Sequence, residues 1–186
     1  MQVEIVSKPG SDIVLIGTDS YEIDMEGNRF SSQKYPTRSK SLINNLVHQK
    51  RFPPHSSLMY RADIVKTIGG YDNRLCPSED YNLWLHLTSF GSFASIPEPL
   101  VEYRHHITNI SKANSGFEQL KFGFAAAACH FIRAVNHNDP SNYRSGEEWL
   151  KFIDWIAERL MEEDILSYRH KKEEFRIMYF HRDNQI

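Results

Sequence analysis

Two adjacent carboxylates, Glu79 and Asp80, follow Ser78 at the point where a helical hydrophobic pattern begins. The positive end of a helix dipole favours ionised acids in the first turn, by about 0.3–1 kcal/mol each when exposed. Adjacent helical residues point in different directions, so one carboxylate can face a cleft while the other anchors the helix. A cleft-facing carboxylate can take a proton from a substrate hydroxyl. First-turn acids also serve simply as caps, so spacing alone leaves both roles open.

The elements that must position these acids follow from the hydrophobic pattern. Apolar or alternating runs predict strands, and amphipathic runs predict helices. The predicted strands are 12–17, 21–24, 55–60, 93–96 and 100–104; the predicted helices are 42–49, 62–67 and one that begins at Ser78. Residues 25–28 read as a hairpin turn and residues 31–41 as a surface loop.

The character of the chain changes after about residue 111. Capping patterns at Ser115 and Ser145 each precede a helical stripe, and a third helix is expected over about 163–180. The first stripe is Phe117, Leu120, Phe124, Ala127, Phe131 and Val135; the second is Trp149, Phe152, Ile153, Ile156 and Leu160. The fold class is therefore α/β (α+β at the level of this fragment), with a mixed region over 1–111 and a helical extension over 112–186.

Composition excludes several classes of function. The 186 residues include 22 Lys plus Arg and 24 Asp plus Glu, so the chain lacks the basic excess that binds nucleic acid. Its two cysteines are too few for a disulfide framework, and no apolar run approaches a membrane span. We expect a cytoplasmic protein that can associate with a membrane peripherally.

Several motifs occur in the order and spacing of family-2 glycosyltransferases. They are Ile13-Val14-Leu15-Ile16-Gly17 with Glu22 to Asn28, His55 to Arg61, Gly69-Gly70-Tyr71-Asp72, Glu79-Asp80-Tyr81-x-Leu83-Trp84-Leu85, and Tyr103-Arg104-x-His106 with Ser111. Each motif is weak alone, but together they resemble the family over roughly residues 11–111. The resemblance implies the acceptor-side half of a GT-A fold, a partial mixed sheet with flanking helices, in enzymes that transfer sugar from a nucleotide diphosphate to an acceptor.

The resemblance also implies roles for individual residues. Asp80 matches the general base, which would deprotonate the acceptor hydroxyl during an inverting displacement, with Glu79 supporting it. Trp84, Tyr81 and His55 would lie on the acceptor side. Core packing is the equally weighted alternative for Trp84.

At the end of the last predicted strand, the resemblance places His106 at a divalent metal, Mg²⁺ or Mn²⁺, near the donor diphosphate. Arg104 would bind the diphosphate or pair with Glu102. His105 replaces the usual apolar residue there, so either histidine can face the cleft. The Asp-x-Asp metal ligands of the family are absent from the 186 residues.

Three hypotheses follow. The chain is part of an inverting glycosyltransferase that is inactive without its donor half, or a non-catalytic binding or assembly module derived from one. A metal-dependent hydrolase using Glu79, Asp80, His105 and His106 fits less well, because the spacing matches no compact ligand set. For an enzyme, the expected partners are a nucleotide-sugar donor and a glycan or lipid-linked acceptor in polysaccharide biosynthesis of the cell envelope. The helical tail can form a homodimer.

Overall fold

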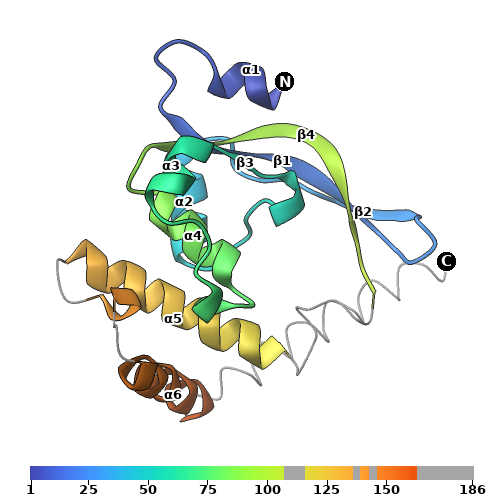
Figure 1. Ribbon diagram of the computed structural model, residues 1–186. Helices are drawn as coiled ribbons and strands as arrows, with labels where there is room; N and C mark the ends of the chain where they lie inside the picture. Colours follow the sequence, from blue (N-terminus) through green and yellow to red (C-terminus); the bar gives the residue numbers. More distant parts are fainter. Residues whose placement is uncertain (107–115, 136–138, 143–145, 163–186) are drawn as a thin grey trace. The chain divides into compact units, whose positions relative to one another are not determined.

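The computed structural model describes residues 1–106, 116–135, 139–142 and 146–162 (Figure 1). The chain divides into two compact units, Met1–Asn109 and Ile110–Ile186, which are described separately. The predicted boundary at residue 111, the Ser115 and Ser145 caps and the predicted helix over 163–180 lie outside the described residues.

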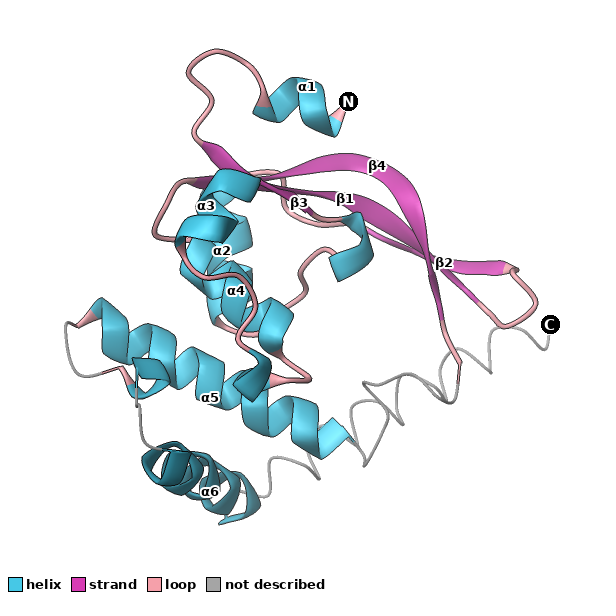
Figure 2. Ribbon diagram, in the orientation of Figure 1, coloured by secondary structure: helices cyan, strands magenta, loops and turns pink. Residues whose placement is uncertain are grey.

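A four-stranded mixed sheet forms the first unit, with β1 (Ile13–Ile23) as its central strand. Strand β4 (Ser92–Arg104) runs parallel to β1 along almost its whole length. Strands β2 (Arg29–Gln33) and β3 (Met59–Tyr60) pair antiparallel with different halves of β1, so they share its other edge (Figure 2). One long strand therefore links every part of the sheet.

Several predicted bounds in the sheet need correction. The predicted strands 12–17 and 21–24 are one continuous strand, because the polar residues between them all pair with β4 and Ser20 also pairs with β2. The segments 93–96 and 100–104 are likewise one strand, in which shifts of register opposite Thr18 and Asp19 accommodate the prolines. The predicted loop 31–41 begins within β2.

The segment 55–60, predicted as a strand, is extended only at Met59–Tyr60. His55–Ser57 is a short 3₁₀ helix that follows two prolines. The Ser57 amide and hydroxyl both donate to the Pro54 carbonyl, at 2.8 and 2.9 Å. These local hydrogen bonds replace pairing with the sheet.

Four helices complete the first unit: α1 (Gln2–Val6), α2 (Ser39–Val47), α3 (Ala62–Thr67) and α4 (Glu79–Leu87). Helices α2, α3 and α4 group on one face of the sheet, whereas α1 contacts β1 from the other side (Figure 1). The core between sheet and helices is apolar and fully buried; it includes Leu15, Ile16, Leu42, Leu46, Leu83, Leu85, Leu87 and Phe93. The predicted helices at 42–49 and 62–67 are confirmed, with small shifts of their ends.

The described part of the second unit contains α5 (Phe117–Ala134), a 3₁₀ turn (Pro140–Asn142) and α6 (Gly146–Glu162). The α6 stripe is confirmed at Trp149, Ile153, Ile156 and Leu160, all buried. The predicted apolar stripe of α5 is wrong at its C-terminal end, because the Phe131 and Val135 side chains are 52% and 62% exposed. Small residues, including Gly123 and Ala126, occupy the buried face instead. The predicted fold class is confirmed: a mixed sheet with flanking helices, followed by a helical region.

Candidate functional site

The loop before β3 is fixed against the sheet and carries His55. A Cβ atom on Gly17 would meet the Pro53 side chain at 2.7 Å and Leu58 at 2.9 Å, so glycine permits this close approach. On the same strand, the Thr18 amide donates to the Ser57 hydroxyl at 3.4 Å. The chain thus crosses β1 at a defined place and leaves the His55 side chain half exposed.

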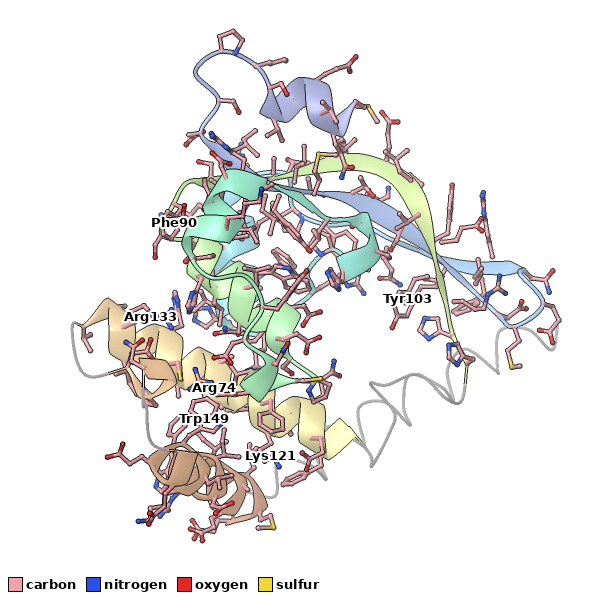
Figure 3. All side chains as sticks on the ribbon, viewed as in Figure 1. Arg74, Phe90, Tyr103, Lys121, Arg133 and Trp149 are labelled. Atoms are coloured by element: carbon pink, nitrogen blue, oxygen red, sulfur yellow. The ribbon has the colours of Figure 1, made fainter. Side chains whose placement is uncertain are left out.

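Helix α4 presents the two predicted carboxylates in its first turn. Ser78 is the N-cap residue of the helix, but its side chain makes no capping hydrogen bond. The segment before the helix is held instead by Asp72, whose carboxylate accepts a hydrogen bond from the Arg74 amide at 3.1 Å (Figure 3). The apolar residues of α4, including Leu83 and Leu85, bury the rest of the helix in the core.

Asp80 lies at the surface end of this arrangement, with 26% of its side chain exposed. Its Oδ2 atom is 3.7 Å from the His55 Nδ1, an ion-pair distance when the imidazole is protonated. Its Oδ1 atom accepts a hydrogen bond from the Tyr81 amide at 2.6 Å. Burial raises the pKa of the Asp80 carboxyl, while this hydrogen bond and the His55 charge act in the opposite direction. Asp80 is therefore a partly exposed carboxylate whose proton affinity is increased by its surroundings.

Aromatic side chains surround His55. Its Nε2 atom lies 3.1 Å from the Tyr71 hydroxyl, which is itself 3.1 Å from the Tyr60 hydroxyl. The Trp84 ring contacts His55 edge-on, with 5.8 Å between ring centroids, and also packs against Phe52. Burial, with the hydrogen bond to Tyr71, raises the pKa of Tyr60.

The structure thus brings together three of the predicted site residues, Asp80, His55 and Trp84. Trp84 is only 8% exposed, so it packs in the core, which was the alternative role given for this residue above. Contact of Trp84 with an acceptor stays a prediction. Spacing in the sequence does not indicate that Tyr60 and Tyr71 join the cluster. Tyr71 stands in the Gly-Gly-Tyr-Asp motif, which was the one signal that could have identified it.

Two other predicted residues lie apart from this cluster. The Tyr81 hydroxyl donates to the Leu46 carbonyl at 3.1 Å, which ties α4 to the end of α2, and burial raises the pKa of Tyr81 to about 12. Glu79 lies beside Cys76, and its negative charge raises the pKa of the Cys76 thiol. Adjacent residues in the first turn of α4 therefore face different surroundings, as expected.

The end of β4 forms a separate group of polar contacts. The Arg104 Nη1 donates to the carbonyls of Asp24 and Met25, both at 2.9 Å, so Arg104 supports the turn between β1 and β2. Glu102 pairs with Arg29 at 2.7 Å. Binding of a diphosphate by Arg104 stays a prediction.

His105 and His106 follow directly. The His105 Nε2 is 3.4 Å from the buried Glu22 carboxylate, and its ring contacts Phe30 and Tyr103, the latter on β4 (Figure 3). His106 is half-buried. Within the described part of the chain, no three His, Cys, Asp or Glu residues group as a metal site. Binding of a metal ion by His106 stays a prediction.

No protein-family model matches the chain. Over 98 residues it is 34% identical to the amylovoran biosynthesis glycosyltransferase AmsE of Erwinia amylovora, a match that covers 50% of this chain and 34% of the relative. Over 97 residues it is 31% identical to the uncharacterized glycosyltransferase MJ1057 of Methanocaldococcus jannaschii, covering 50% of this chain and 32% of the relative. The chain thus spans about a third of the length of the curated relatives it matches.

No described helix is long and apolar enough to cross a membrane. Similarity to two proteins named as glycosyltransferases supports, in general terms, a glycosyltransferase-type function for this chain.

Proposed function

We propose that this chain is the acceptor-side portion of a family-2, GT-A-type glycosyltransferase, and that Asp80 is its general base. The similarity to glycosyltransferases supports the reaction class. The observation that carries the assignment is the Asp80 carboxylate itself: a first-turn acid, partly exposed, beside a histidine and two tyrosines.

In the proposed reaction, the acceptor hydroxyl oxygen forms a bond to the anomeric carbon of the donor sugar as its proton passes to the Asp80 carboxylate. The bond from that carbon to the nucleoside diphosphate breaks, and the diphosphate leaves with the electron pair. Direct displacement inverts the anomeric configuration. A base with a raised pKa holds the transferred proton better.

The donor, metal and acceptor belong to the proposal as well. We propose a nucleotide-sugar donor, with Mg²⁺ or Mn²⁺ held mainly by residues outside this chain, since its 186 residues contain no Asp-x-Asp. The name of the Erwinia relative supports a glycan acceptor of polysaccharide biosynthesis. Because the chain covers about a third of its relatives, a non-catalytic binding or assembly module is the second candidate.

Substitution of Asp80 tests the proposed base. In a polypeptide that carries this chain together with a donor-binding portion, we expect Asp80→Asn to lower kcat about 10²- to 10⁴-fold, the usual contribution of a general base, with little change in donor affinity. Release of nucleoside diphosphate measures the rate. Asp63→Asn is the matched control, because Asp63 is an exposed carboxylate paired with Arg61. Equal rates for the wild type and Asp80→Asn would remove Asp80 from the base role and favour the binding module.

A further inference from the structure

A continuous line of polar contacts runs from Asp80 along the surface of the protein. It runs from the Asp80 Oδ2 to the His55 Nδ1 at 3.7 Å, from the His55 Nε2 to the Tyr71 hydroxyl at 3.1 Å, and on to the Tyr60 hydroxyl at 3.1 Å. The four side chains come from α4, the 3₁₀ turn, the loop after α3, and β3. Such an assembly depends on the tertiary fold.

Both ring nitrogens of His55 are accounted for in this arrangement. A protonated imidazole carries an N–H on each nitrogen, so it can donate to the Tyr71 hydroxyl through Nε2 while its Nδ1–H faces Asp80. Tyr71 in turn shares a hydrogen bond with Tyr60, whose hydroxyl stays protonated because burial raises its pKa. The Trp84 ring packs against the imidazole in a T-shaped arrangement.

Three further titratable side chains in the described part of the chain act on this pair. Tyr71 and Tyr60 lie on the Nε2 side of the ring, and Glu79 adds a negative charge on the Asp80 side. When it is protonated, His55 favours the ionised form of Asp80, whereas burial and the charge of Glu79 oppose that form.

We propose that His55 is a positioning residue for Asp80: it orients the carboxylate and holds it ionised, and the Tyr71–Tyr60 hydroxyl pair fixes the imidazole. This proposal deepens the proposed function, because its catalytic consequence rests on Asp80 acting as the base. The charge coupling between His55 and Asp80 does not depend on any activity.

The coupling can be measured on the 186-residue chain. The Asp80 carboxyl is titrated by NMR with ¹³C-labelled aspartate, and its signal is assigned with Asp80→Asn. In His55→Gln, which retains a polar side chain but loses the charge, we expect the Asp80 titration to move to higher pH. His48→Gln is the matched control, because His48 is an exposed histidine at the end of α2 that contacts its own helix. The control should leave the Asp80 titration unchanged.

A second variant tests the role of the tyrosine pair. Tyr71→Phe keeps the aromatic ring but removes the hydroxyl that contacts His55, so we expect an upward shift of the Asp80 titration that is smaller than in His55→Gln. Each variant is compared with wild type by its amide spectrum, to verify that the fold is intact. If neither His55→Gln nor Tyr71→Phe moves the titration beyond His48→Gln, the proposal is overturned.

The kinetic arm separates this proposal from the proposed function. In the polypeptide with a donor-binding portion, His55→Gln should move the acidic limb of the kcat/KM profile to higher pH and lower kcat more than it changes the acceptor KM. A loss confined to KM would instead assign His55 to acceptor binding and overturn the positioning role. If Asp80→Asn leaves transfer unchanged while the NMR shift is present, the proposed base fails and the measured coupling stands.

Discussion

At the residue scale, the ionised form of Asp80 that a general base requires is also the form that its burial disfavours. Burial raises the pKa of its carboxyl above the ordinary value of 3.8, so the folded state binds this proton more tightly than the unfolded state does. The stability that this carboxyl group contributes is fully present below pH 3.8, and it is lost as the pH rises through the pKa of the folded state. At neutral pH the ionised carboxylate therefore destabilises the fold.

A neutral side chain of the same shape should relieve this cost. We expect Asp80→Asn to unfold at a higher temperature than the wild type at neutral pH. This difference in unfolding temperature should shrink below pH 3.8, where both side chains are neutral. Thermal unfolding followed by circular dichroism across this pH range checks the expectation. An Asp80→Asn variant that is less stable at neutral pH would show that the contacts of the ionised carboxylate outweigh its burial.

At the element scale, the position of His55 depends on a close approach between β1 and the loop that precedes β3. Gly17 makes this approach possible, since a Cβ there would overlap Pro53 and Leu58. The Thr18 amide also donates a hydrogen bond to the Ser57 hydroxyl, so a displacement of the 3₁₀ turn would break this contact.

We expect Gly17→Ala to destabilise the chain by about 1–3 kcal/mol, the usual cost of overpacking, and to displace the loop that carries His55. The free energy of unfolding from urea titration measures the first effect, and the chemical shifts of the His55 ring report the second. Gly146→Ala is the control, because a Cβ at Gly146 meets open space and should be neutral or slightly stabilising. Equal effects of the two substitutions would contradict the packing argument.

At the scale of the whole molecule, the chain combines a small mixed sheet with a separate helical unit. The candidate base and its neighbours all lie in the first unit, within Met1–Asn109. No group of metal ligands occurs in the described part of the chain, and the chain spans about a third of its curated relatives. We propose that the donor site lies in a part of the relatives that this chain does not match.

From this we expect the 186-residue chain alone to transfer no sugar. Transfer should appear when a donor-binding portion is joined to its first unit. The measurement is nucleoside diphosphate release from a panel of nucleotide sugars, with Mg²⁺ or Mn²⁺, in the presence and absence of a glycan acceptor. Transfer by the chain alone, abolished in Asp80→Asn, would show that these residues contain a complete active site.

The sequence alone predicted the fold class, most helices and the placement of Glu79 and Asp80 in the first turn of a helix, because hydrophobic periodicity and turn residues are local signals. It also predicted the α6 stripe, which repeats at helical spacing. It did not predict that Ile13–Ile23 and Ser92–Arg104 are two uninterrupted strands, since the pairing that joins their halves comes from residues far away.

The tertiary structure decided which side chains meet. His55 contacts Asp80 and Trp84, whereas Tyr81, next to Asp80 in sequence, turns to the Leu46 carbonyl. Trp84 became a core residue because its helix packs against the loop containing Phe52. Sequence spacing fixes direction along one helix, but contacts between a helix and a loop depend on packing across the sheet. The position of Asp80 in its helix could therefore be predicted from the sequence, whereas its contact with His55 could be found only from the tertiary structure.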